Sequence, residues 1–179
     1  MLPVDVLISE HRLILYTVGV LKKEQQKAAS VRKVDANFIV SAVDFFRTFA
    51  DRYHHGKEEG ILFNELYKRK MSEVDAAVMR ELILEHATAR RTVTLLEKQE
   101  ASYLGGSAEA LVNILEALNT LIELYPRHIE KEDKHFFYSS MTYFTEKEQK
   151  NMFQKFQEYN QNFTNNKYKL TIETLEKGI

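Results

Sequence analysis

Two ten-residue stretches of this chain carry the same pattern of histidine, glutamate and apolar side chains. One begins at His54 and has Glu58 four residues further on. The other begins at His128 and has Glu132 at the same distance. Four residues are about one turn of an α-helix, so each pair projects from one helix face and both of its side chains can reach the same metal ion. The spacing therefore predicts a helix in both stretches.

The repetition extends to the segments that precede these stretches. A Glu-His pair at His11 is echoed by a Glu-His pair at His86, and His54 and His128 follow them after 43 and 42 residues. The chain thus holds two copies of a helix with one histidine followed by a helix with His-x-x-x-Glu. Such a duplication predicts four antiparallel helices around a pseudo-twofold axis, with one ligand set from each half meeting at the centre. Two sets suit two metal ions.

Apolar side chains at intervals of three and four residues predict helices along most of the chain. Only two prolines and six glycines interrupt the 179 residues. The expected helices cover residues 3–29, 35–70, 72–104, 107–140 and about 145–162, and a tail to residue 179 follows. We expect an all-α fold in one domain, residues 1–179: an up-down-up-down four-helix bundle over about 4–140, with an additional C-terminal helix packed outside it.

Several of these helices have recognisable start and stop signals. Asp35 suits an N-cap for the second helix, and Ser72 does so for the third. The third helix should stop at the glycine pair that begins at Gly105. Thr145 and Glu148 form a capping box that predicts the start of the C-terminal helix.

The composition is that of an ordinary globular protein without thiol chemistry. Hydrophobic residues make up 44% and charged residues 28% of the chain, which is enough for one buried core. The 25 basic and 26 acidic side chains nearly cancel, so we expect neither nucleic acid nor an anionic membrane as a partner. Because there is no cysteine, any metal site must use nitrogen and oxygen ligands.

The N-terminal residues lack the pattern of a signal peptide. Asp5, Glu10 and His11 soon interrupt the apolar start, whereas a signal peptide needs a basic start and a longer apolar run. No apolar stretch approaches the ~20 residues that a membrane-spanning helix requires. We therefore expect a cytoplasmic protein.

Four of the six histidines fall on the inward stripes of the four expected bundle helices, together with two glutamates. A single histidine on an apolar stripe is more often a core residue than a ligand. A buried carboxylate, however, costs several kcal/mol unless a metal or another cation is near it. The joint pattern therefore indicates a metal site. The candidate ligands are His11, His54, Glu58, His86, His128 and Glu132.

Three further candidates rank below these six. His55, Glu59 and Asp133 each directly follow a candidate ligand, so an ideal α-helix places them about 100° round from the ligand stripe. We expect them on the flank or at the surface, where they can also hold the ligands in place. His135 is expected near the end of the bundle.

On these residues the sequence resembles the hemerythrin-like cation-binding family. The resemblance covers roughly residues 4–140. Its motifs are Glu10-His11, His54-His55-x-x-Glu58-Glu59-x-x-Leu62-Phe63, Glu85-His86 and His128-Ile-x-Lys-Glu132-Asp133. It implies a bundle around an oxo- or hydroxo-bridged di-iron centre, with the four histidines as terminal ligands and the two glutamates as bridges. Imidazole and carboxylate ligands suit iron or manganese, and they also accept zinc.

The chain departs from the oxygen carriers that belong to this family. Those proteins have a second histidine one turn after the ligand of the third helix, and here Arg90 stands at that place. They also favour His-x-x-x-x-Asp on the fourth helix, so its acid ligand is either Glu132 or Asp133. Four histidines and two glutamates are instead similar to the branch that handles nitric oxide damage and repairs iron–sulfur centres.

The leading hypothesis is a di-iron protein that binds or reacts with oxygen, nitric oxide or peroxide, for stress response, sensing or iron-centre repair. The alternative is a metal-binding storage or sensor module that does no catalysis and signals through a partner. The pattern leaves open whether the protein is an enzyme and whether it is a monomer or a homodimer.

Overall fold

The computed structural model describes residues 1–161, and all regular structure in that range is helical. The elements, with η for π-helix, are α1 (Pro3–Val31), α2 (Ala36–Phe45), η1 (Phe46–His55), η2 (Glu58–Phe63), α3 (Asn64–Leu66), α4 (Glu73–Leu104), α5 (Ala108–Lys131), η3 (Glu132–Phe136), α6 (Phe137–Met141) and α7 (Glu146–Gln161). The all-α prediction is confirmed. The expected end of the last helix near residue 162, and the tail, lie outside the described residues.

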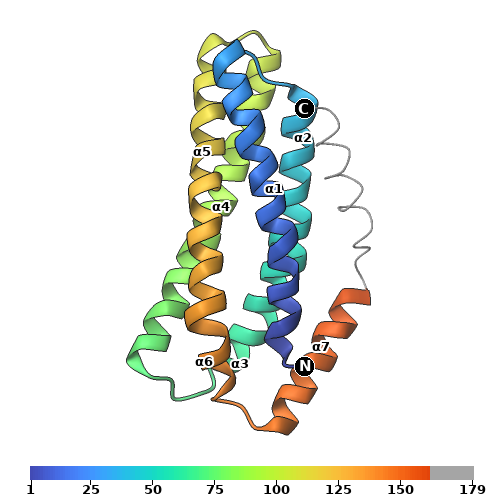
Figure 1. The fold of residues 1–179 in the computed structure, drawn as a ribbon, viewed down its shortest axis with the longest axis vertical. Coiled ribbons are helices and arrows are strands. Elements are labelled where there is room, and N and C mark those ends of the chain that lie inside the picture. The colour runs from blue at the N-terminus through green and yellow to red at the C-terminus, as the bar shows by residue number, and fades with distance from the viewer. Residues whose placement is uncertain (162–179) are drawn as a thin grey trace.

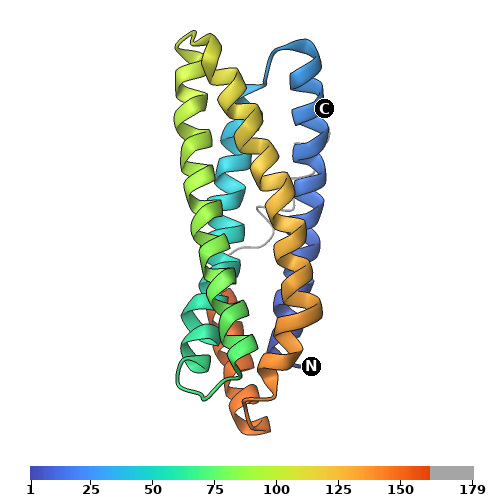
Figure 2. The same ribbon diagram turned by 90° about the vertical axis from the view of Figure 1, so that its left-hand side faces the viewer.

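Long helical rods run side by side along the longest axis of the molecule (Figure 1). They are α1, α2 continued by η1, α4, and α5. The α1–α2 and α4–α5 connections lie at one end, and the turns that enter α4 and α7 lie at the other (Figure 2). The last helix, α7, packs against the lower end of the rods, beside the N-terminus. No helix among the described residues is both long and apolar enough to span a membrane.

The helix ends form as the sequence predicts. The Asp35 carboxylate accepts a hydrogen bond from the backbone N–H of Asn37 (2.9 Å), and the Ser72 hydroxyl accepts one from Asp75 (3.0 Å). At the start of α7 the Glu148 carboxylate accepts the backbone N–H of Thr145 (2.8 Å). These contacts satisfy N–H groups that have no partner inside the helix, and so they set where each helix starts.

Three stretches adopt π-helical geometry where the sequence predicted uninterrupted α-helix. They are η1, η2 and η3: η1 includes His54, η2 begins at Glu58, and η3 begins at Glu132. A π-helix closes hydrogen bonds from residue i to i+5, so each residue turns through less than the ~100° of an α-helix. Adjacent side chains in these stretches therefore point in more similar directions than an α-helical projection allows.

The apolar core is divided into two clusters. The upper cluster lies towards the α1–α2 and α4–α5 connections and contains residues such as Ile14, Phe46 and Leu121. The lower cluster lies towards the turns that enter α4 and α7 and contains residues such as Leu7 and Phe136. On each rod the buried candidate ligands lie near the boundary between the parts that belong to the two clusters. The candidate ligands therefore occupy a polar layer that is closed off by apolar side chains above and below.

The C-terminal helix α7 is attached to the lower end of the bundle. Met152 and Phe156 are buried in the lower apolar cluster, as expected for a helix that packs on the outside. Beyond them, the Tyr159 hydroxyl donates a hydrogen bond to the backbone carbonyl of Arg52 in η1 (2.6 Å). This contact brings α7 next to the segment that carries His54.

Candidate metal centre

Four buried histidines lie at the centre of the bundle, and a carboxylate holds the Nδ1 atom of each. The pairs are His11–Asp133 (2.8 Å), His54–Glu10 (2.9 Å), His86–Glu59 (2.6 Å) and His128–Glu85 (2.8 Å). An ionised carboxylate can only accept hydrogen bonds, so Nδ1 carries the proton in each pair. The other nitrogen, Nε2, is then left with its lone pair facing the interior, which is the arrangement typical of metal-binding histidines.

These Nε2 atoms face one another in two pairs. The His11 and His54 atoms are 2.9 Å apart, and the His86 and His128 atoms are 3.1 Å apart. Two lone pairs at this distance repel unless a cation lies beside both of them. Nitrogen ligands that sit at right angles, about 2.1 Å from one metal ion, are separated by about 3 Å. The observed spacing fits two donors to a single ion in each pair.

Two glutamates connect the histidine pairs. The two oxygens of Glu58 lie 3.2 Å from His54 Nε2 and 3.3 Å from His86 Nε2. For Glu132, Oε2 lies 3.3 Å from the Nε2 atoms of both His11 and His128. Each carboxylate therefore contacts one histidine from each pair, which is the position of a bridging ligand.

Both glutamates are fully buried, and none of their four oxygens has a hydrogen-bond partner among the described residues. Burial raises the pKa of Glu132, and the neighbouring Glu58 carboxylate raises it further, well above its usual range. Burial acts on Glu58 in the same sense, but the imidazoles of His54 and His86 outweigh it and lower the pKa of Glu58. A metal cation would compensate both carboxylates, so the residues fit a bound metal.

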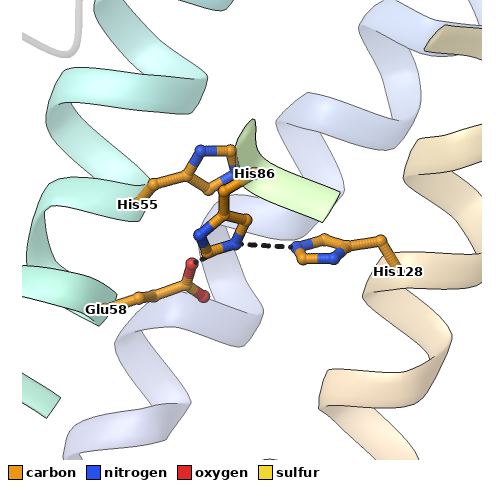
Figure 3. A group of neighbouring side chains, drawn as sticks. All are labelled: His55, Glu58, His86 and His128. Atoms are coloured by element: carbon orange, nitrogen blue, oxygen red, sulfur yellow. Dashed lines mark hydrogen bonds and ion pairs between the residues drawn. The ribbon is translucent and has the colours of Figure 1, made fainter. Parts of the chain in front are cut away.

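The ligand atoms form two groups that share Glu58. Within each group, the ligand atoms all lie within 4.8 Å of one another. One group is His11, His54, Glu58 and Glu132, and the other is His55, Glu58, His86 and His128. Figure 3 shows the second group converging from three rods of the bundle. All of these residues are buried, and their nitrogen and oxygen atoms are donors that iron, manganese and zinc accept.

The three lower-ranked candidates take two different places. Glu59 and Asp133 are each 31% exposed and hold the Nδ1 atoms of His86 and His11. His55 is instead buried inside the second group, not on the flank where the α-helical projection placed it. The difference arises because His54 and His55 end the π-helical stretch η1, in which neighbouring residues diverge less. His135 is exposed, near the end of the bundle as expected.

Sequence reasoning assigned no role to Glu10 and Glu85, although both hold central histidines. The repeat in the sequence could have indicated both glutamates, because each directly precedes the single histidine of the first helix in its half of the chain. Glu10 holds His54, and Glu85 holds the equivalent His128. The assignment needs the contact between helices, since each glutamate serves the histidine of the next helix and not its own neighbour in sequence.

With this geometry established, comparison with known proteins gives one match. The model of the hemerythrin HHE cation-binding domain matches residues 2–138. The chain belongs to this family. Among curated proteins and solved structures, no match was found. The hemerythrin HHE region includes all six principal candidates, and α7 lies beyond it.

Arg90 lies one helical turn after His86. The sequence comparison with the oxygen carriers placed a second histidine at this position. Its guanidinium donates to Asp51 (2.7 Å) and to Glu59 (2.6 Å). Glu59 in turn holds His86, so Arg90 steadies one of the central histidines without entering the group. In this hemerythrin HHE domain, α4 thus presents one histidine to the centre and an ion-paired arginine one turn further on.

Proposed function

We propose that this protein is a non-haem di-iron protein that binds or reacts with a small molecule: oxygen, nitric oxide or peroxide. The observation that carries the proposal is the pair of buried glutamates. All four of their oxygens lack hydrogen bonds among the described residues, and each glutamate lies against histidines from both pairs. Without a metal, the neighbouring imidazoles offset the burial of Glu58, and Glu132 must hold a proton to avoid a buried charge.

The residues divide between two metal positions. His11 and His54 would hold the first iron, His86 and His128 the second, and Glu58 and Glu132 would bridge them. We assign the acid ligand of α5 and η3 to Glu132, because Asp133 is engaged by His11 Nδ1. When bound, a pair of iron ions supplies electrons and open coordination positions for a small molecule.

The protein groups around the site orient the ligands and exclude water. The carboxylates on the Nδ1 atoms fix the tautomer and the ring orientation of each histidine. His11 also stacks on Phe137 (ring centroids 5.6 Å apart), and His86 stacks on Phe63 (6.1 Å). Both phenylalanines belong to the lower apolar cluster, so apolar side chains close this side of the site, which favours small, weakly polar molecules over large polar substrates.

The proposal includes an up-down-up-down arrangement of the four rods, in a single hemerythrin-like domain that spans residues 1–179. It places the protein in the cytoplasm, as a monomer or homodimer, in stress response, sensing or iron-centre repair. The near balance of basic and acidic residues supports a small-molecule partner over nucleic acid.

Metal analysis and visible spectra of freshly purified protein test the proposal. We expect about two iron ions per chain and an absorption that changes on exposure to oxygen. His54→Ala and His128→Ala should each lose iron, whereas His135→Ala, at an exposed histidine, should keep it. Wild-type protein that takes up no metal and is no more stable in its presence would rule the proposal out.

A second candidate is a metal-binding storage or sensor module, and one contact favours it. The buried Lys57 ammonium donates to Glu10, which holds His54, and to the amide oxygen of Asn160 in α7 (2.8 Å). This chain of contacts links the metal position to the C-terminal helix. A partner that recognises α7 could therefore respond to metal binding.

Hydrogen exchange separates this candidate from the first. The module predicts that metal changes the exchange of α7 amides, without turnover of oxygen, nitric oxide or peroxide. Lys57→Met should abolish that change and leave the metal bound, because it removes the link between Glu10 and Asn160 and the contact of the ammonium with the Tyr53 ring, but no candidate ligand. Turnover of one of the three molecules would favour the first candidate.

A further inference from the structure

His55 is a fifth histidine inside the bundle that the six principal ligands do not include. The residue is only 1% exposed, and its Nε2 atom has no hydrogen-bond partner among the described residues. A buried imidazole nitrogen without a partner loses its hydration and gains no hydrogen bond in return, which destabilises the folded chain. A ligand bound to Nε2, such as a metal ion, would remove this cost.

The surroundings of His55 repeat the arrangement of the other four central histidines. Its Nδ1 atom faces the Asp51 carboxylate at 3.4 Å, as theirs face carboxylates at shorter distances. One of its nitrogens lies within 4.8 Å of ligand atoms of Glu58, His86 and His128 (Figure 3). The unpartnered atom, Nε2, is the one left to serve as that ligand.

We propose that His55 is the fifth histidine ligand of the centre and that it binds the second metal position, beside His86 and His128. This inference rests on the proposed function, since it concerns the same pair of metal ions. The oxygen carriers have this extra histidine on the third bundle helix, where this chain has Arg90. Here His55, on a different helix, would take its part. The π-helical end of η1 makes the replacement possible, because it turns both His54 and His55 inward.

The ion pairs of Arg90 are part of the same arrangement. Its guanidinium binds Asp51 and Glu59 together, and these carboxylates face the Nδ1 atoms of His55 and His86. Arg90 therefore acts as a positioning residue for two neighbouring ligands of one metal. A histidine at residue 90 would abolish this bridge.

The consequence is that the two metal positions differ. The first position is held by two histidines and the second by three, while the glutamates serve both. With fewer protein donors, the first position keeps more room for a small molecule.

The competing explanation is that His55 only fills space. Its ring stacks on His86 (centroids 3.8 Å apart) and more distantly on Tyr125 (6.4 Å), as an aromatic spacer would. It also forms part of the wall of a cavity of about 200 Å³ that Phe46 and Arg90 line as well. A ligand differs from a spacer because it needs a nitrogen lone pair that points at the metal. In the stack the lone pairs of His55 and His86 lie in separate, nearly parallel planes, so binding one ion together requires the His55 ring to turn out of the stack.

The test is iron retention and Mössbauer spectroscopy of iron-loaded protein, with His55→Phe as the main variant. Phenylalanine keeps an aromatic ring in the stack and has no donor atom. We expect wild-type protein to give two signals of equal area. The His55→Phe variant should change the signal of one iron and release that iron to a chelator on the order of 100-fold more readily. The His135→Phe control should match wild type, because His135 is exposed.

Chemical rescue gives an independent result if phenylalanine disturbs the packing. His55→Ala leaves a space beside the 200 Å³ cavity, which gives small molecules a way in. Imidazole should restore the lost iron and its signal, whereas pyrrole, which has the same shape without a free lone pair, should not. Equal rescue by pyrrole would show a spacer and overturn the proposal.

The proposal also fails if His55→Phe holds both irons as tightly as wild type, with unchanged signals. Wild-type protein that binds no iron at all would instead refute the proposed function itself. The two failures are therefore distinguishable. Circular dichroism of each variant establishes that a lost iron reflects a lost ligand and not an unfolded bundle.

Discussion

The carboxylate that holds each central histidine comes from a different rod of the bundle. Glu10 on α1 holds His54 of η1, and Asp133 of η3 holds His11 of α1. Glu85 on α4 and Glu59 of η2 repeat the pattern in the other half of the molecule. Each contact therefore orients a ring and also ties two rods together across the site.

Removing one of these carboxylates should weaken metal binding without abolishing it. Asp133→Ala should lower iron affinity by roughly 10–100-fold, because His11 loses the partner that fixes its tautomer and orientation. Competition with a chelator measures the change. Glu130→Ala is the matched control, since Glu130 is exposed and forms its ion pair with Lys134, away from the central histidines. The assignment of Asp133 fails if both variants lose equal affinity.

Metal binding should release a proton from Glu132. Burial and the adjacent Glu58 hold the pKa of Glu132 well above its usual range, so the metal-free carboxyl is protonated at a pH where an ordinary glutamate is ionised. The metal must displace that proton, and affinity therefore rises as pH increases towards this raised pKa. Calorimetry in buffers of different ionisation enthalpy counts the protons, and Glu132→Gln should release fewer. An affinity that falls as pH rises would contradict the assignment.

At the scale of elements, the π-helical stretches and α7 determine what surrounds the ligands. The stretches η1 and η2 flank Gly56, and α7 packs directly against this point. A Cβ atom at Gly56 would overlap the Tyr159 hydroxyl, which donates to the Arg52 carbonyl. Glycine is therefore needed here for the close approach of α7 to the ligand-bearing helix.

Gly56→Ala should loosen α7 locally. The added methyl group displaces Tyr159 and breaks its hydrogen bond, so amides of α7 should exchange faster while the metal content stays the same. Gly60→Ala is the control, because a Cβ there meets no atom within 4 Å and alanine should add about 0.5–1 kcal/mol of stability. Combining Gly56→Ala with Tyr159→Phe removes the obstructing hydroxyl, so partial recovery is expected. Unchanged exchange in Gly56→Ala would contradict the proposed contact.

At the scale of the whole molecule, the two apolar clusters are separated by a layer of buried polar groups. That layer is costly in the metal-free state, because Glu58, Glu132 and His55 contain buried atoms that have no hydrogen-bond partner within residues 1–161. The bundle therefore combines two well-packed ends with a centre that requires a ligand. Metal binding and folding should be thermodynamically linked.

Removing the metal should lower the stability of the folded chain. Free metal at about 100 times Kd adds about 2.7 kcal/mol to the free energy of unfolding. Thermal denaturation with and without a chelator measures the difference. A Glu58→Ala/Glu132→Ala double variant should show no dependence on metal, since it lacks both bridging carboxylates. Identical melting temperatures for loaded and metal-free wild type would contradict the linkage.

The sequence by itself determined the helices, their caps and the alignment of each histidine with its glutamate. These features depend on spacing over three to five residues, as in the cap at Ser72 and the pair of His54 and Glu58. The duplicated order of motifs also carried the expectation that two ligand sets meet. Local geometry is enough for such conclusions, because the helical period relates position in sequence to position on a face.

Only the tertiary structure decided which side chains complete the site. The π-helical turns direct His55 inward, against a projection that assumes about 100° per residue. Packing of neighbouring rods places Glu10 and Glu85 on histidines 43 or 44 residues away and leaves Asp133 on His11. These contacts depend on helix rotation and on the distance between rods, which long-range packing sets and local spacing cannot encode.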